Sequence, residues 1–291
     1  MKKTWTYYLG GIAVSLLFGV SSALCNDAAT DSALSDEANA TTRIAANIPA
    51  TGAAVIADHP LIPVIRWAEK ERPNIAAIKD YTAILQKQEN IGGKLQGAQV
   101  LEVKVRHEPF SVYTKFRFPQ EMNGQQAIYV KGQNDGKLIG HGVGLERKLG
   151  TLRFDPDGFI PMRNQKYPIT EMGILNLVDK LLEVGYRDSQ FGGCEVTYTE
   201  GVVIGTGPSA RECTMIQVTH PKPRANVTFH IARIFVDKEL NVPIRYESYD
   251  WPQREGETPA LIEAYTYMNL KLNVGLTDAD FDQTNPAYAF P

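Results

Sequence analysis

Hydrophobic and polar residues alternate with a period of two along much of the chain after residue 98. In 101–105 apolar residues alternate with Glu and Lys, and 112–118 repeats the pattern with Lys and Arg. Because successive side chains of a strand point to opposite faces of a sheet, these segments predict two half-buried strands. Glu108-Pro109 would lie at the turn between them.

Further strands are predicted where alternating or β-branched stretches lie between turn signals. The clearest turn is Asn134-Asp135-Gly136, because these residue types tolerate the positive φ of a tight hairpin. The other predicted strands are 127–131, 138–143, 148–154, 194–199, 213–219, 227–236, 242–251 and 262–272.

Helical spacing of apolar residues predicts a helix over 61–71. A longer helix is predicted from Thr170, as its N-cap, to Gly185, which would end it. The segment 74–85 fits either a helix or a strand, and 277–280 has the pattern of a capping box for a short last helix.

The order of these elements predicts a mainly β, α+β domain, because strands follow strands with one long helix between two groups. We expect a large curled antiparallel sheet or unclosed β-barrel with helices packed on one side. The strand 227–236 is apolar on both faces and should be covered on both sides. One face carries Phe229, Ile231, Arg233 and Phe235.

The first 25 residues have the features of a signal peptide. Two lysines precede an uncharged, mostly apolar stretch at 8–23, which is shorter than the ~20 apolar residues of a membrane helix. We expect cleavage after Ala23 or after Cys25 and export to the periplasm or the medium. A lipid anchor on Cys25 is the alternative, which Leu24 disfavours because lipoprotein signals have a small residue there.

The rest of the chain divides into two parts. Residues 26–60 are rich in Ala and lack aromatic residues, a composition typical of a disordered tether. Residues 61–291 are expected to form a single β-rich domain.

The charge of the chain disfavours two classes of partner. The full sequence has 30 basic and 33 acidic residues, and loss of 1–25 removes two lysines and no acid, which leaves a net charge of −5. Nucleic-acid binding is therefore not expected, since no basic excess is present to neutralise phosphates. Electrostatic attraction to anionic membranes is not expected either.

Once residues 1–25 are removed, Cys194 and Cys213 are the two cysteines that remain. They lie near the starts of two predicted neighbouring strands. In an oxidising compartment we expect them to form a disulfide, provided that the register brings their Cα atoms to ~5.5 Å.

The sequence contains no recognisable catalytic, metal or cofactor motif. The five histidines lack metal-ligand spacing, and neither a Gly-x-Ser-x-Gly elbow nor a phosphate-binding loop is present. No catalytic residue, metal or cofactor is therefore predicted.

Several blocks of the sequence together resemble an uncharacterised family of secreted bacterial proteins, a domain of unknown function. The resemblance covers about residues 75–291 and is carried by 109–113, 127–130, 134–138, 243–252 and 263–267. The family is distantly similar to the LolA/LppX-like periplasmic carriers. This similarity implies an unclosed β-barrel, lidded by helices, around a cavity that holds acyl chains.

The leading hypothesis is a non-enzymatic envelope protein that binds a lipid or lipoprotein acyl chain, which an envelope protein partner delivers. One alternative is a structural or interaction protein whose barrel is filled by its own side chains, and a less favoured one is a cell-envelope hydrolase. The residues expected to face the cavity are Phe116, Phe118, Phe229, Ile231 and Phe235.

Overall fold

The computed structural model describes residues 59–291 of the 291-residue chain. The predicted signal peptide, the alternative lipid attachment at Cys25 and residues 26–58 of the predicted tether lie outside the described residues. His59, at the end of the predicted tether, is described and is buried.

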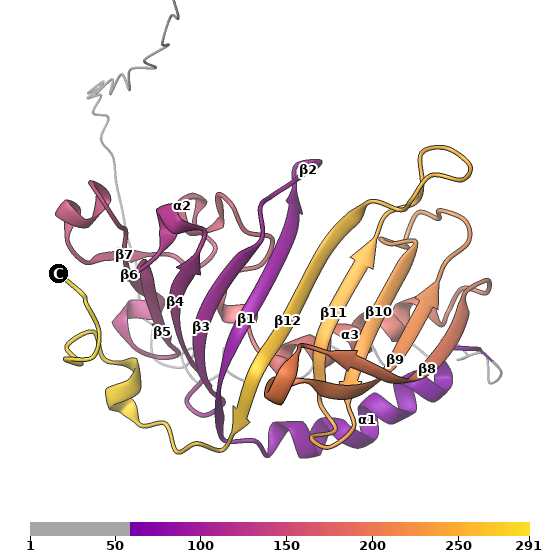
Figure 1. Ribbon diagram of the computed structural model, residues 1–291, viewed down its shortest axis with the longest axis horizontal. Helices are drawn as coiled ribbons and strands as arrows, with labels where there is room; N and C mark the ends of the chain where they lie inside the picture. Colours follow the sequence, from indigo (N-terminus) through magenta and orange to yellow (C-terminus); the bar gives the residue numbers. More distant parts are fainter. Residues whose placement is uncertain (1–58) are drawn as a thin grey trace, which may run out of the picture. The chain divides into compact units, whose positions relative to one another are not determined.

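Twelve strands form one antiparallel sheet whose two end strands, β7 and β8, do not pair with each other (Figure 1). The order across the sheet is β7-β6-β5-β4-β3-β1-β12-β11-β10-β9-β8, and β2 pairs with β1 beside this path. The predicted large, unclosed antiparallel sheet is thus confirmed. The strands are β1 (Asp80–Ile91), β2 (Lys94–Leu95), β3 (Gln99–Arg106), β4 (Ser111–Phe118), β5 (Gln126–Val130), β6 (Leu138–His141), β7 (Leu152–Phe154), β8 (Glu195–Ile204), β9 (Arg211–Thr219), β10 (Ile231–Asp237), β11 (Pro243–Tyr249) and β12 (Leu261–Leu272).

Three α-helices accompany the sheet in the described part of the chain: α1 (Ile62–Ala76), α2 (Phe159–Met162) and α3 (Ile174–Asp188). Both long helices, α1 and α3, pack on one face of the sheet, here called the helix face; the opposite face is called the outer face. Short 3₁₀ turns lie at Gln120–Met122, Asn134–Gly136, Glu146–Leu149, Ile169–Glu171, Gly207–Ser209 and Asp278–Phe281.

The long helix α3 corrects two predictions about its ends. Thr170 is not its N-cap, because 169–171 forms a 3₁₀ turn and Gly173, with φ 119°, precedes the helix. Gly185 does not end the helix but lies inside it, where its missing side chain lets α1 approach. A Cβ at Gly185 would lie 3.2 Å from Cγ1 of Ile65.

The ambiguous segment 74–85 is divided between a helix and a strand. The helix α1 continues through Pro73, and β1 begins at Asp80. The alternation of Tyr81, Ala83 and Leu85 therefore indicated the correct element.

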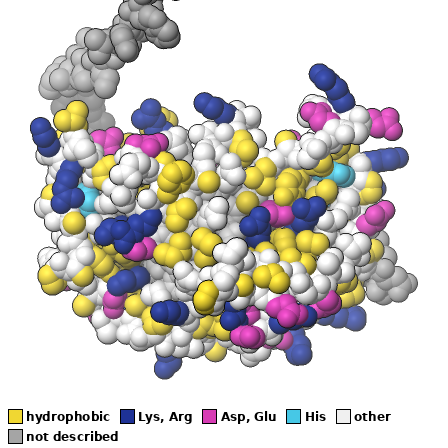
Figure 2. All heavy atoms as spheres, in the orientation of Figure 1, with side chains coloured by type: hydrophobic (Ala, Val, Ile, Leu, Met, Phe, Trp, Pro, Cys, Tyr) yellow, Lys and Arg dark blue, Asp and Glu magenta, His cyan; other side chains and the backbone are white. Residues whose placement is uncertain are grey.

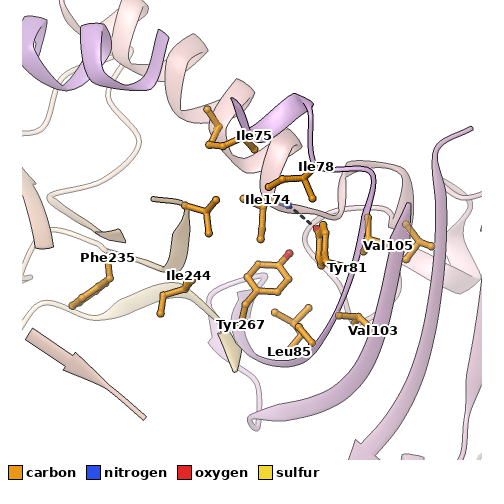
Figure 3. Close-up of a cluster of buried hydrophobic side chains, with 14 of the residues drawn as sticks. Ile75, Ile78, Tyr81, Leu85, Val103, Val105, Ile174, Phe235, Ile244 and Tyr267 are labelled. Atoms are coloured by element: carbon orange, nitrogen blue, oxygen red, sulfur yellow. Dashed lines mark hydrogen bonds between the residues drawn. The ribbon is translucent and has the colours of Figure 1, made fainter. Parts of the chain in front are cut away.

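A hydrophobic core lies between the helix face and the two long helices (Figure 3). Tyr81, which is fully buried, points from β1 towards the start of α3, and its hydroxyl oxygen accepts a hydrogen bond of 2.9 Å from the backbone N–H of Ile174. The first N–H groups of a helix have no partner within the helix, so this contact satisfies one of them. The same core includes Leu85, Val103 and Val105 from the central strands.

A smaller core covers part of the outer face. Tyr113, Ile128 and Val130 from β4 and β5 pack against Phe281 and Tyr288 of the segment after β12. The rings of Tyr113 and Tyr288 stack with centroids 4.1 Å apart. The predicted capping box at 277–280 is confirmed and begins the turn that carries Phe281.

The predicted disulfide between Cys194 and Cys213 is wrong, and both cysteines are free thiols. Their strands do pair, but Glu195 is opposite Thr219 and Val202 is opposite Cys213. Cys194 therefore lies beside position 220, seven residues along β9 from Cys213, or roughly 23 Å at the usual rise of a strand. A disulfide requires Cα atoms within about 7 Å.

Candidate functional site

The chain between β7 and α3 crosses the helix face of the sheet. We call residues 159–173 the cover segment; it consists of α2, irregular chain and one 3₁₀ turn. Ile169 and Met172 are only partly buried and pack against the hydrophobic core, and Gly173 lies close to Tyr81 and Val105. The cover segment thus closes apolar surface of β1 and β3 without a long helix of its own.

A cluster of ionisable side chains lies under the cover segment. Lys87 and Glu89 continue the inward alternation of Tyr81, Ala83 and Leu85 along β1, and each is 4% exposed. The ammonium nitrogen of Lys87 lies 3.0 Å from Oε2 of Glu89 and 3.1 Å from Oε1 of Gln165.

The neighbouring strand β12 supplies the second half of this cluster. The Tyr265 hydroxyl donates a hydrogen bond of 2.6 Å to Glu89, and it lies 3.4 Å from a carboxylate oxygen of Glu263. Glu263 in turn forms an ion pair with Lys166, at 3.0 Å, and accepts a hydrogen bond of 3.4 Å from the Tyr167 hydroxyl.

Three consecutive residues of the cover segment, Gln165, Lys166 and Tyr167, therefore contact charged groups on the sheet. We call these contacts, together with Lys87, Glu89, Glu263 and Tyr265, the polar latch. They join the cover segment to β1 and β12, so that its displacement would break all three contacts.

Burial controls the ionisation of the latch. Desolvation lowers the pKa of Lys87, although the carboxylate of Glu89 acts in the opposite direction. Desolvation and the charges of Glu263 and Glu89 raise the pKa of Tyr265 well above its usual range, and desolvation and Glu263 likewise raise that of Tyr167. Both phenols therefore remain protonated at neutral pH and can donate to the carboxylates.

Both carboxylates of the latch are already engaged. Glu89 contacts Lys87 and Tyr265, while Glu263 contacts Lys166 and Tyr167. General acid–base catalysis requires a carboxyl group within reach of a substrate proton. The observed contacts favour a role in holding the cover segment over one in catalysis.

The hollow beside the end of the cover segment is small. It has a volume of about 30 Å³ and is lined by Val105, His107, Phe110, Met172 and Gly173, among others. This is the room of about one water molecule, whereas ligand pockets usually have about 300–1,000 Å³. The helix face next to this hollow is therefore filled by the protein's own side chains.

A second hollow, of about 130 Å³, lies on the outer face of the sheet. Its lining includes Gln86, Gln88, Arg245, Glu247 and Thr266. Arg245 donates hydrogen bonds to both Glu247 and Thr266, so its polar groups largely satisfy one another. Figure 2 shows this face, on which basic and acidic side chains alternate near the middle.

The five residues predicted to face a cavity do not form one surface. Phe116 lies on the helix face of β4 and is buried in the main core, whereas Phe118, at the end of the same strand, is 52% exposed. Phe229 precedes β10 and belongs to a separate buried cluster with Cys194.

Ile231, Arg233 and Phe235 share the side of β10 opposite Ile234, the outer face. Phe235 is nevertheless buried and belongs to the same core cluster as Phe116. The guanidinium of Arg245 lies over the Phe235 ring, at 5.6 Å from its centroid. Ile234 points to the helix face and packs against residues of α1 and α3. The helix face of this strand is covered as predicted, whereas Ile231 and Arg233 on the outer face are only half-buried, so cover on both sides is found at the Phe235 end alone. Ile231 does not contribute to a lipid cavity on the helix face.

A further buried polar pair joins the end of α3 to the end of β9. Nε2 of His220 lies 3.3 Å from Oδ2 of Asp188, and both side chains are at least nine-tenths buried. Nδ1 of His230 lies 2.8 Å from the backbone carbonyl oxygen of His220. Across residues 59–291, no three His, Cys, Asp or Glu side chains gather as they would around a metal ion.

One protein-family model matches most of this chain. The family model "Protein of unknown function (DUF1571)" covers residues 78–290. The chain belongs to the DUF1571 family. The expected membership of a family of unknown function is thereby confirmed, and no curated protein matches the sequence.

Several solved structures are similar to this DUF1571 protein. A DUF1329 family protein from Desulfovibrio piger has 15% identity and a TM-score of 0.36, over 77% of this chain and 98% of its own. The lipoprotein LppX from Mycobacterium tuberculosis has 9% identity and a TM-score of 0.42, over 76% and 100%. LprF from Mycobacterium bovis has 10% identity and a TM-score of 0.39, over 74% and 95%. With TM-scores below 0.5, these likenesses carry no argument about the ligand of the DUF1571 domain.

The described helices of this DUF1571 protein do not include one that is both long and apolar enough to cross a membrane.

Proposed function

We propose that this DUF1571 protein is a non-enzymatic protein of the bacterial envelope that binds an acyl chain by displacing its cover segment from the helix face. The observation that carries the proposal is a short, partly buried cover over apolar strands, held down by a polar latch rather than by a continuous core. Export of the chain is part of this proposal and is supported by the signal-peptide pattern.

The surface under the cover segment suits an acyl chain. Val103, Val105 and Val112 from β3 and β4 are buried on the helix face, and Ile169 and Met172 of the cover segment pack against the same core. If the cover moved away, a lipid tail could take the place of these two side chains. Each buried CH₂ group contributes ~0.8 kcal/mol, so a tail of moderate length would offset the loss of a few side-chain contacts.

The latch determines how easily this site opens. The apparent affinity of a ligand for a rarely open site is reduced by the open fraction. Weakening the latch should therefore strengthen binding of a fluorescent fatty-acid probe. If the contacts of Lys166 and Tyr167 contribute about 1 kcal/mol to closure, their loss should tighten the apparent Kd roughly fivefold.

The test compares the mature wild-type protein with the double variant Lys166→Gln and Tyr167→Phe. Lys180→Gln is the matched control, since it removes an exposed lysine that pairs with Glu183 on α3, away from the latch. Ile231→Trp, on the outer face, should also leave binding unchanged. Saturable binding that tightens only in the latch variant supports the proposal.

A second candidate function is a structural or interaction protein with a filled interior. The observation that favours it is the one-water volume of the hollow beside the cover segment. If the wild-type protein and the latch variant both fold but neither binds the probe saturably, acyl binding is refuted and this second function remains.

A further inference from the structure

The part of the chain that leads into the cover segment carries an unusual set of exposed apolar side chains. Leu145, Leu149 and Leu152 are 79%, 66% and 36% exposed, and Phe159 and Ile160 are 82% and 66% exposed. Large apolar residues so exposed and so close in sequence are not explained by the packing of this domain, because they add nothing to its cores.

These residues lie on short elements at one rim of the molecule rather than in a groove. Leu145 precedes a 3₁₀ turn between β6 and β7, and Leu149 is the last residue of that turn. Leu152 begins the end strand β7, and Phe159 and Ile160 begin α2. In Figure 1, α2 and the connection from β6 to β7 both lie at the upper rim of the sheet. We call residues 145–163 the apolar rim.

Cationic side chains are interspersed with the apolar ones. Arg147, Lys148, Arg153 and Arg163 are exposed, and no ion pair between described residues involves any of them. Figure 2 shows Lys and Arg side chains along the upper edge of the molecule, together with hydrophobic and acidic ones. Unpaired cations next to protruding apolar groups can reach lipid phosphates while the apolar groups enter the acyl layer.

From these observations we infer that the apolar rim docks on the surface of a phospholipid bilayer. A lipid surface accommodates side chains that protrude from separate short elements, whereas a protein partner would need a matching pocket for each. Arg147 donates a hydrogen bond of 2.8 Å to the backbone carbonyl of Ala289, whereas no side-chain hydrogen bond or ion pair is seen for Lys148, Arg153 and Arg163 in the described part of the chain. The lipid headgroup provides the phosphate that complements these cations. The inference goes beyond the proposed acyl site and does not require it.

The charge of the rim predicts how the docking depends on salt. The four cations share the segment with three exposed acids, Glu146, Asp155 and Asp157. Insertion of apolar side chains should therefore contribute most of the binding free energy, and attraction to anionic lipid should contribute little. This agrees with a mature chain whose overall charge is negative.

The experiment is co-flotation of the mature protein with vesicles of phosphatidylcholine, alone or mixed with an equal part of phosphatidylglycerol. We expect binding to both, with little loss at raised salt. Phe159→Ser combined with Ile160→Ser should weaken binding roughly tenfold or more, since the two most exposed large side chains of the α2 turn are then polar. The matched control is Tyr198→Ser with Val203→Ser, which removes two exposed apolar residues of β8 at the other end of the sheet.

A separate readout follows the position of the rim directly. The tryptophan emission of Phe159→Trp, measured as a difference from the wild type, should shift to shorter wavelength on vesicles and be quenched by brominated lipid. Equal binding by the rim variant and the wild type would overturn the inference, as would equal losses in the rim and control variants. The inference would also be overturned if the wild-type protein bound neither vesicle type. If the wild type were then a dimer and the rim variant a monomer, the rim would be assigned to contact with a second copy of the chain.

Acyl binding is measured separately with the monomeric probe described above. Flotation without probe binding would refute the acyl site alone, and probe binding without flotation would refute the docking alone.

Discussion

Replacing Glu89 with Gln should strongly destabilise the domain, because it would leave the ammonium group of Lys87 buried without a carboxylate. Both side chains are 4% exposed and their charged atoms are 3.0 Å apart. Breaking a buried ion pair by removing one partner costs about 3–5 kcal/mol. Gln165 offers Lys87 only a neutral acceptor, at 3.1 Å, so most of this cost should appear in the free energy of unfolding.

The double variant Lys87→Met with Glu89→Gln separates the pair from its surroundings. Replacement of a whole buried ion pair by groups of similar volume is often close to neutral. We therefore expect the double variant to be more stable than Glu89→Gln alone, with a coupling energy of about 2–3 kcal/mol between the two sites. The measurement is urea-induced unfolding of the mature protein and its variants.

The exposed pair of Lys180 and Glu183 on α3 provides the control cycle. Its coupling energy should be about 0.5 kcal/mol or less, since both groups are solvated. A Glu89→Gln variant that loses less than about 1 kcal/mol, or a Lys87–Glu89 coupling no larger than that of the control, would refute the reasoning.

The pH dependence gives an independent test of Lys87. Burial lowers its pKa in the folded protein, so the unfolded chain binds more protons between that lowered value and about 10.4, the value of an unperturbed lysine. The wild-type protein should therefore gain stability relative to Lys87→Met as the pH rises towards 10.4. A difference that stays constant or shrinks over this range would contradict a Lys87 pKa lowered by burial.

Three other changes test separate parts of the fold. Asp237→Asn should lower the free energy of unfolding by about 2–4 kcal/mol, because Asp237 is fully buried and accepts two hydrogen bonds from Arg211. Burial opposes ionisation of Asp237, but these hydrogen bonds lower its pKa. The stability that the carboxylate contributes should therefore be lost in acid, as the pH falls through that lowered pKa. Thiol titration should find Cys194 and Cys213 both free in the unfolded, non-reduced mature protein, and both should react slowly while it is folded, since burial raises the pKa of each thiol and that of Cys213 to about 11. Gly185→Leu should lower the midpoint of thermal unfolding by an amount equivalent to about 1–3 kcal/mol, because its side chain would push α1 away from α3; an unchanged midpoint would show that the two helices can separate freely.

The sheet could be predicted from the sequence because its signal is local. Alternation in 101–105 reflects a strand with one buried and one half-exposed face. Segment 112–118 shows the same alternation, but its first residues are buried on both faces, because the chain after β12 covers Tyr113. The ends of α3 were harder to predict, since Gly185 looks like a terminator but is retained inside the helix for close contact with Ile65.

The candidate site was harder to predict than the sheet, because it depends on the register in which neighbouring strands pair. The expected pairing of Cys194 with Cys213 needed the offset between β8 and β9, which no local pattern contains. The inward alternation of Tyr81, Ala83 and Leu85 was visible in the sequence. Its continuation to charged residues was not recognised, since Lys and Glu are almost never fully buried unless they are paired.

The expected cavity residues show the same limit on a single strand. Ile231 and Phe235 share a face with Arg233, and that face is the outer one. Periodicity identifies which residues lie together, but the side that meets the helices is decided by contacts distant in sequence, such as that of Ile234 with α1.

The position of α1 has a practical consequence for how the domain is delimited. The family match begins at residue 78, after the end of α1 at Ala76. Yet Val64 and Trp67 of α1 cover Ile216 and Ile234 on the sheet. An expressed fragment that starts at residue 78 would therefore expose this apolar surface and should aggregate, whereas one that starts before His59 retains the complete folding unit. The stretch by which relatives are recognised is shorter, by one helix, than the stretch that has to be made for the protein to fold.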